Sequence, residues 1–364
     1  MKKHQVILVI LAMVAIFLLV YSPHFNYPFP YHVDEWHHLE QARKIINGEY
    51  QWGQGSLEAG FQFFLAGIWI LSDATLNLPL FQGEVPRSVR GGGVLNLVLF
   101  YKFLPALWAV FGALTLFWLT RRLTKNFYIA LLSIIFFASI KSDVNITGLW
   151  FFTPLSFAIP FIFLYIYFLV EGINQQKKKF ILVGLAIMAF LLLFHAVSVL
   201  FSLPILLIYF LANWRYLTKE WKFFLLFLII PIVGIIFYKF SFNLPWQELA
   251  GKLLEQIQFK RGWGVLELNN PLTEVFSAVG FILAIIGVVS IIAEKKTKKY
   301  LFHLLWPAVM FFWIVIYRVS GVSFFSPHQR NLYYLVLGLP LLSAIGFFYL
   351  ITHCRILFDK INFP

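Results

Sequence analysis

Long apolar runs separated by polar connections dominate the hydropathy pattern of this chain. A helix needs about 20 predominantly apolar residues to cross a bilayer, and somewhat fewer where helices pack in a bundle. By this measure the pattern predicts ten membrane-spanning helices, at residues 6–22, 98–120, 127–142, 149–170, 180–195, 196–213, 222–240, 273–293, 301–317 and 331–352. The expected fold class is therefore an all-α integral membrane bundle, with residues 1–364 forming a single polytopic domain.

The polar connections are unequal in length. The long ones all fall on one side of the bilayer, at residues 23–97, 241–272 and 318–330. The first of them is too long to be a simple connection. Within it the sequence predicts a helix at 33–47, ended by Gly48, and a shorter apolar helix at 57–71 that lies on the membrane or partly enters it. A full crossing by 57–71 is an alternative that would reverse the charge pattern of the next loop.

Charge gives the orientation. With the N-terminus inside, 17 of the 29 basic residues and four of the 16 acidic residues fall on the inner side, so the whole net charge of +13 lies there. This distribution is what the positive-inside rule expects, and it explains the basic isoelectric point without a nucleic-acid partner. No small-x-small cleavage site follows the first apolar run, which favours a retained first helix over a signal peptide and places both termini in the cytoplasm.

Composition agrees with this interpretation and excludes several classes of protein. Hydrophobic residues make up 60% of the chain and charged residues only 12%, far from the balance of a soluble domain. The single cysteine, Cys354, excludes an intramolecular disulfide and a cysteine-rich zinc site. The inner loops are short and contain no Walker-type or dinucleotide-binding motif, which argues against a nucleotide-driven protein.

The densest polar cluster lies about ten residues after the first predicted span, in the sequence His32-Val33-Asp34-Glu35-Trp36-His37-His38. On a helix, Asp34 shares a face with His37 and His38, whereas Glu35 points about 100° away. We therefore expect Asp34 to act as a general base and Glu35 to position a substrate. Acidic residues also favour a helix N-terminus for purely structural reasons, and a divalent metal held by these side chains is a further alternative, although the HExxH spacing is absent.

Other polar side chains stand where predicted spans reach the outer side. Arg330 begins the last predicted span beside His328, and its guanidinium could contact a phosphate at two oxygens. On the same side, Asp143 follows one apolar segment and His195 divides two others. We predict that His37, His38, Asp143, His195, His328 and Arg330 contribute to binding the donor phosphate or another part of the substrate.

A first membrane helix followed by an outer loop that opens with an acidic pair on a helix resembles the GT-C superfamily of membrane glycosyltransferases. This superfamily includes the protein O-mannosyltransferases and the lipid A aminoarabinose transferases. The residues that carry the resemblance are Asp34-Glu35 with the helix to Asn47, the segment 57–71, and Trp118-Leu119-Thr120-Arg121-Arg122-Leu123. Weaker similarities occur at His195 and at 328–330.

The resemblance implies a function. Such enzymes take a sugar from a polyprenyl-phosphate carrier and transfer it, on the extracytoplasmic face, to an acceptor such as a glycolipid, glycan or other component of the cell envelope. Asp34 would be the base, inversion of the anomeric centre would accompany a one-step attack, and a divalent metal would be an optional cofactor. The size of the chain favours a prokaryotic inner membrane.

Two other functions fit the sequence less well. A transporter or flippase of a lipid-linked glycan would carry ionisable residues near the middle of its spans, whereas here the acidic residues gather in the outer loops. Prolines within apolar segments, such as Pro160 and Pro231, keep this alternative open. A non-catalytic membrane scaffold is the third interpretation, and it would tolerate replacement of Asp34.

Overall fold

The computed structural model describes residues 2–27, 30, 32–50, 58–76, 101–142, 148–241, 245–248, 251, 258–260 and 272–361. Asp143 lies outside these described residues. So does most of the stretch 246–259, which the sequence predicts to be amphipathic. The elements, in chain order, are α1 (Lys3–Tyr21), η1 (Ser22–Phe25), α2 (Val33–Ile46), α3 (Ala59–Leu76), α5 (Leu104–Thr124), α6 (Phe127–Ala138), α7 (Pro154–Asn174), α8 (Lys178–Phe194), α9 (Val197–Leu200), α10 (Ser202–Ala212), α11 (Trp214–Lys219), α12 (Trp221–Ser241), β1 (Gln258–Lys260), η4 (Leu272–Glu274), α14 (Ala278–Ala293), α15 (Thr297–Ser320), β2 (Val322–Phe324), α16 (His328–Leu337) and α17 (Leu339–Ile361).

Helices occupy all ten segments for which the hydropathy pattern predicts a span. Among the described residues, five helices are long and apolar enough to cross a bilayer, at Lys3–Phe25, Leu104–Thr124, Pro154–Asn174, Thr297–Ser320 and His328–Cys354. The chain is therefore an integral membrane protein, and ten crossings stay a prediction. Two predicted segments are each divided into two helices: 196–213 becomes α9 and α10, and the last segment becomes α16 and α17 with Gly338 between them.

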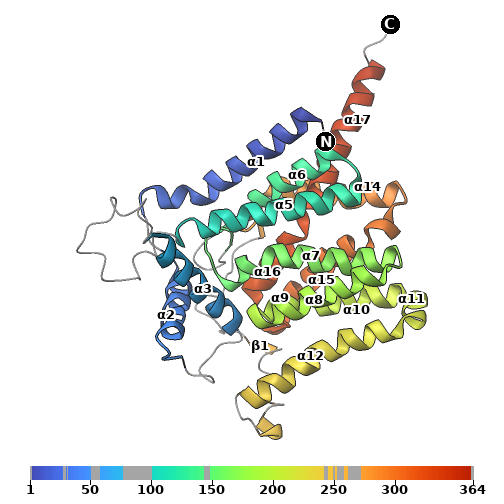
Figure 1. Ribbon diagram of the computed structural model, residues 1–364. Helices are drawn as coiled ribbons and strands as arrows, with labels where there is room; N and C mark the ends of the chain where they lie inside the picture. The colour runs from blue at the N-terminus through green and yellow to red at the C-terminus, as the bar shows by residue number, and fades with distance from the viewer. Residues whose placement is uncertain are drawn as a thin grey trace.

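The helices of the bundle run between two chemically different ends (Figure 1). Helices α2 and α3 lie at one end, while the two termini and the turn between α14 and α15 lie at the other. Three hairpin turns at this second end each contain one residue in the left-handed region, at Lys125 (φ 58°), Gln176 (φ 54°) and Lys295 (φ 55°). These tight turns bring three basic loops together, on the end that the charge pattern predicts to be cytoplasmic.

One large apolar core joins the bundle helices, and its closest helix contact is between α14 and α17. A Cβ placed on Gly346 would lie 1.9 Å from the carbonyl oxygen of Leu283, so only glycine permits this backbone approach. The Ser343 hydroxyl also donates a hydrogen bond across the contact to the carbonyl of Gly280, at 2.8 Å. Small residues at a contact of this kind allow membrane helices to gain packing energy that lipid cannot supply.

A second, smaller apolar core attaches the connection after α1 to the bundle. It contains Leu39 of α2, Phe61 and Trp69 of α3, and Phe152 and Phe157 near the start of α7. These aromatic side chains are nearly or completely buried, which fixes α2 and α3 against the ends of the spans. The predicted helix 33–47 is confirmed as α2, and Gly48 follows it with a φ of +72°. The segment predicted at 57–71 forms α3 and extends to Leu76.

A short antiparallel ladder joins the two other long connections. Strands β1 and β2 pair with Phe259 opposite Ser323. The sequence did not predict this ladder.

Candidate active site

Four segments that are far apart in the sequence meet at the α2–α3 end of the bundle. They contribute Asp34 and His38 from α2, Glu58 immediately before α3, His195 immediately after α8, and Arg330 in the first turn of α16. We call these five residues the Glu58 cluster. The Nε2 atom of His38 lies 3.5 Å from one oxygen of Glu58, and the Nε2 atom of His195 lies 3.7 Å from the other. Arg330 and Asp34 are both close enough to act on the Glu58 charge.

The first turn of α2 is held in place by its own side chains and by that of its N-cap residue. His32 is the N-cap, and its Nδ1 atom accepts a hydrogen bond from the backbone N–H of Asp34 at 3.0 Å. In return, Glu35 accepts a hydrogen bond from the backbone N–H of His32 at 3.0 Å. This reciprocal arrangement is a capping box, which satisfies two backbone donors that the helix leaves open. It fixes the direction in which the next side chain, Asp34, leaves the helix.

Glu35 also connects α2 to the bundle. Its other oxygen accepts a hydrogen bond from the backbone N–H of Phe152 at 2.7 Å, and the Tyr101 hydroxyl donates to the carbonyl of the same residue. The Glu35 side chain is buried, with 1% of its surface exposed. Both of its oxygens therefore bind backbone donors, and its carboxylate faces the protein interior.

Asp34 points in a different direction. Its side chain is 47% exposed, although one of its oxygens comes within 3.4 Å of the His32 Nδ1 atom. That nitrogen accepts a hydrogen bond from the Asp34 backbone N–H, so it has no hydrogen to donate to the carboxylate. Asp34 is thus an accessible carboxylate on a rigid helix start.

A close helix contact places Glu58 beside His195. A Cβ built on Gly60 would lie 2.4 Å from the backbone oxygen of Leu193, so α3 approaches the last turn of α8 at a distance that only glycine allows. Glu58 stands two residues before Gly60, and His195 stands two residues after Leu193. The contact therefore brings the two side chains to the same point.

Hydrogen bonds link His195 to the helix that carries Arg330. The His195 Nδ1 atom is 2.6 Å from the Ser198 hydroxyl, which is 3.0 Å from the hydroxyl of Tyr334. The carbonyl of Tyr334 accepts a hydrogen bond from the Trp306 indole N–H at 2.8 Å. Tyr334 lies one turn after Arg330 on α16, so the same contacts fix Arg330 relative to His195.

The start of α16 is fixed by a second buried network. Asn331 donates to the Ser323 hydroxyl at 2.7 Å, and Ser323 donates to the carbonyl of Ser326 at 2.7 Å. The Ser326 hydroxyl donates in turn to the Asn331 side chain. All three side chains are fully buried, and a satisfied polar network of this kind gives a segment one defined conformation. Arg330, next to Asn331, is held at the cluster in this way.

Burial changes the pKa of Glu58 and that of His38 in this cluster. Desolvation by its neighbours raises its pKa from 4.5 to about 7, with Arg330 opposing the rise and Asp34 adding to it. The pKa of His38 falls to about 3, chiefly because the ring is buried and secondarily because His37 and His32 are near. At neutral pH His38 is therefore uncharged, while Glu58 is close to half protonated.

The raised pKa of Glu58 predicts a specific pH dependence of stability. The folded protein keeps a proton on Glu58 that the unfolded chain releases, so this contribution to stability is present below about pH 4.5 and is lost as the pH rises to about 7. The melting temperature of the wild type should fall over this range relative to that of Glu58→Gln, which does not titrate. Thermal unfolding of the detergent-solubilised protein measures the difference. Glu49→Gln, at an exposed site, should show no such pH-dependent difference, and parallel curves for wild type and Glu58→Gln would contradict the shift.

The other predicted site residues have different surroundings. His37 is exposed and its ring lies 5.5 Å from that of His38. His328 is buried and stacks on Tyr317 of α15, with ring centroids 4.0 Å apart. Asp143 lies outside the described residues. The structure thus gathers Asp34, His38, His195 and Arg330 around Glu58, a single acidic residue before an apolar helix that is not among the site residues predicted from the sequence.

No cofactor is assigned to the site. Among the described residues, no group of three or more histidine, cysteine, aspartate or glutamate side chains is arranged to hold a metal ion. A divalent metal stays a sequence-based alternative.

Comparison with known proteins places the fold. No family model matches the sequence, and no curated protein sequence matches it. The structure is similar to the crystal structure of the Archaeoglobus fulgidus oligosaccharyltransferase tethered to an acceptor peptide containing the NVT sequon, with a TM-score of 0.59 and 14% sequence identity. The match covers 99% of this chain and 50% of that one, so the chain spans about half the length of this neighbour. At this level of identity the similarity shows a shared fold alone.

Proposed function

We propose that this protein is a membrane glycosyltransferase that transfers a sugar from a lipid-phosphate donor to a hydroxyl acceptor at the Glu58 cluster. The observation that carries the proposal is the convergence of an accessible carboxylate, Asp34, and a fixed guanidinium, Arg330, at one end of a fold shared with the oligosaccharyltransferase. A transferase of this kind needs a base for the acceptor and a positive charge for the leaving phosphate. The cluster contains both.

The proposed step is a single displacement. The acceptor hydroxyl gives its proton to the Asp34 carboxylate while its oxygen forms a bond to the anomeric carbon. The bond from that carbon to the phosphate oxygen breaks, and the lipid phosphate leaves with the electron pair. Attack from the face opposite the leaving group inverts the anomeric centre. The phosphate is already a stable anion, so it needs no general acid, and Arg330 stabilises the negative charge that it gains.

Two other acidic residues, Glu35 and Glu58, act by position. Glu35 holds the first turn of α2 against Phe152 and thereby aims Asp34, so we assign it a positioning role and not contact with substrate. Glu58 lies between His38 and His195 and offers hydrogen-bonding groups to sugar hydroxyls. The donor would be a polyprenyl-phosphate sugar and the acceptor a glycolipid, glycan or other cell-envelope component. The structure of the neighbour contains an acceptor peptide, so peptides should be tested as acceptors too.

The proposed localisation follows from the charge pattern. The basic end of the bundle would face the cytoplasm, and the Glu58 cluster would face the extracytoplasmic side of a prokaryotic inner membrane. The cluster would then meet polyprenyl-linked sugars presented on the outer leaflet.

Reconstitution of the purified protein tests the proposal. Proteoliposomes would receive radiolabelled polyprenyl-phosphate sugars together with glycolipid, glycan and peptide acceptors, and the products would be separated from the donor. We expect label to become covalently attached to an acceptor, with inverted anomeric configuration. Label that only changes leaflet, while still attached to its carrier, would instead identify a flippase and overturn the proposal.

A further inference from the structure

The end of the bundle opposite the Glu58 cluster contains two joined cavities of contrasting chemistry. The first, of about 610 Å³, is lined by Arg122, Lys125, Lys295, Lys296, Lys298 and Lys299, and by one carboxylate, Glu171. The second, of about 50 Å³, lies deeper between α5, α7, α15 and the α16–α17 junction, and is lined mainly by apolar side chains such as Leu119, Phe163 and Trp306. Leu123 and Glu171 line both, so the basic cavity continues into the apolar one.

The charge of the basic cavity is largely uncompensated. Lys296 forms an ion pair with Glu294, at 2.5 Å. Within the described residues, the other five cations of the cavity have no carboxylate oxygen within 4.0 Å. Three separate turns, after α5, α7 and α14, supply the lining. The cations lie in or beside the turns after α5 and α14, and gathering them costs repulsion that a bound anion would relieve.

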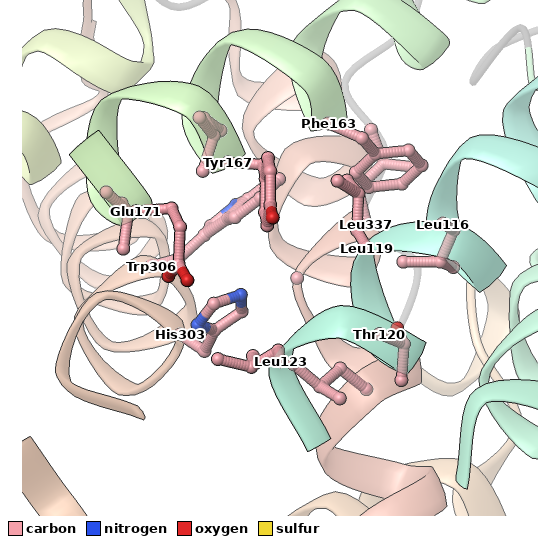
Figure 2. A pocket seen from close by; sticks show the side chains of 14 residues that line it. Leu116, Leu119, Thr120, Leu123, Phe163, Tyr167, Glu171, His303, Trp306 and Leu337 are labelled. Atoms are coloured by element: carbon pink, nitrogen blue, oxygen red, sulfur yellow. The ribbon is translucent and has the colours of Figure 1, made fainter. Parts of the chain in front are cut away.

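The apolar cavity contains one polar atom that nothing in the described structure satisfies. The Nδ1 atom of His303 is buried and has no hydrogen-bond partner there. Figure 2 shows the His303 ring and the Glu171 carboxylate pointing into the cavity, with Leu119 and Phe163 on its other side. A buried, unpaired nitrogen is costly, so its position favours a ligand that brings a hydrogen-bonding group to the junction of the two cavities.

We propose that these joined cavities bind an anionic phospholipid of the cytoplasmic leaflet. The phosphate lies among the lysines and Arg122, the ester or hydroxyl groups reach His303 at the junction, and the first part of the acyl chain enters between α5, α7 and α15. A soluble phosphate matches only the first cavity, whereas an amphiphile matches both. Basic pockets between membrane helices on the cytoplasmic side are typical binding sites for such headgroups.

This site is separate from the proposed donor site. Helix α5 has 21 residues and is therefore about 30 Å long, and it runs from the α2–α3 end to the basic end. Phosphates bound at the two ends would lie in opposite leaflets. The inference thus stands or falls independently of the proposed transferase activity.

Lipid retention tests this site. The full-length protein would be purified from membranes of phosphatidylcholine with a minor fraction of phosphatidylglycerol, washed in detergent, and examined by native mass spectrometry. We expect preferential retention of phosphatidylglycerol. The combined change Lys125→Gln, Lys295→Gln and Lys298→Gln should lower that retention about tenfold or more, because each basic side chain near a lipid phosphate contributes to binding.

A matched variant and a cavity-filling variant make the test specific. Lys177→Gln, Lys179→Gln and Lys219→Gln remove the same charge from the same end of the bundle, outside the cavity lining, and should leave retention unchanged. Leu119→Trp leaves the charges intact but fills the apolar cavity, so it should lower lipid retention. Thermal unfolding would establish that each variant is folded.

Three results would overturn the proposal. Equal loss of lipid in both triple variants would indicate general surface attraction. Unchanged lipid retention in the variant that lacks the three cavity lysines would show that the lipid does not bind in this cavity. Binding of inorganic phosphate in competition with lipid, together with no effect of Leu119→Trp, would identify a soluble anion as the ligand.

Discussion

Asp34→Asn should abolish sugar transfer while leaving the protein as stable as the wild type. Asparagine is nearly isosteric with aspartate and keeps the backbone N–H that His32 accepts, so the first turn of α2 is retained. It cannot take a proton from the acceptor hydroxyl. Loss of a positioned general base typically lowers the rate by about 100- to 10,000-fold. The measurement is initial rate of transfer at equal amounts of reconstituted protein, with the donor that the wild type uses.

A residue on the same helix provides the control for Asp34→Asn. Glu40 lies on the exposed face of α2 and binds Arg43 at 2.8 and 2.9 Å. Glu40→Gln removes one carboxylate from α2 without touching the Glu58 cluster, and transfer should stay near the wild-type rate. A rate for Asp34→Asn within about threefold of the wild type would remove Asp34 from the chemical step, and the proposed mechanism with it.

Glu35→Ala should lower both stability and activity. The backbone N–H groups of His32 and Phe152 would lose their buried acceptor, and each unsatisfied donor costs about 1–3 kcal/mol. We therefore expect a loss of roughly 2–6 kcal/mol in the free energy of unfolding, seen as a clear fall in the melting temperature. Transfer would decline because α2 no longer holds Asp34 in one direction.

The two neighbouring acidic residues can thus be separated by their effects. Glu35→Gln keeps one carbonyl oxygen as an acceptor, so it should be less destabilising than Glu35→Ala. Activity and melting temperature should fall together in the Glu35 series, whereas Asp34→Asn should change activity alone. If Glu35→Ala left the melting temperature unchanged but stopped transfer, the carboxylate would act on substrate, as the sequence first indicated, and not through the helix start.

The elements that the sequence predicted well are those whose signal is local. Apolar runs of about the length of a bilayer identified the positions of the bundle helices, because lipid requires each span to satisfy its own backbone hydrogen bonds. Helix α2 was predicted because its acidic first turn and the terminal Gly48 lie close together in the sequence. Asp34 became a candidate because it lies in the densest polar cluster, and Arg330 because it begins an apolar segment.

The surroundings of Glu58 could not be predicted from the neighbouring sequence. In the sequence it is a single carboxylate before an apolar helix, and nothing nearby marks it. It acquires its surroundings only because α3 packs against α8 at Gly60, which sets its oxygens beside His38 and His195. Burial raises its pKa, and Arg330, a residue 272 positions away in the sequence, opposes that rise.

Asp34 and Glu35 show the same difference between what the local sequence predicts and what a tertiary contact decides. Their spacing on a helix predicted that Asp34 and Glu35 point in different directions, and that prediction needs only helical geometry. Which of the two faces the interior was decided by Phe152, a residue 117 positions away from Glu35, whose backbone N–H needs a buried acceptor.

By itself the sequence determined that this is a helical membrane protein, where its helices lie and on which side its charge gathers, because hydropathy and charge act residue by residue on the chain in a bilayer. Only the tertiary structure decided which carboxylate is buried, which is accessible, and which histidines and arginine surround Glu58. The physical reason is that desolvation and hydrogen-bond pairing depend on contacts between segments. The close approach of α3 to α8 at Gly60, which brings Glu58 to His195, is such a contact.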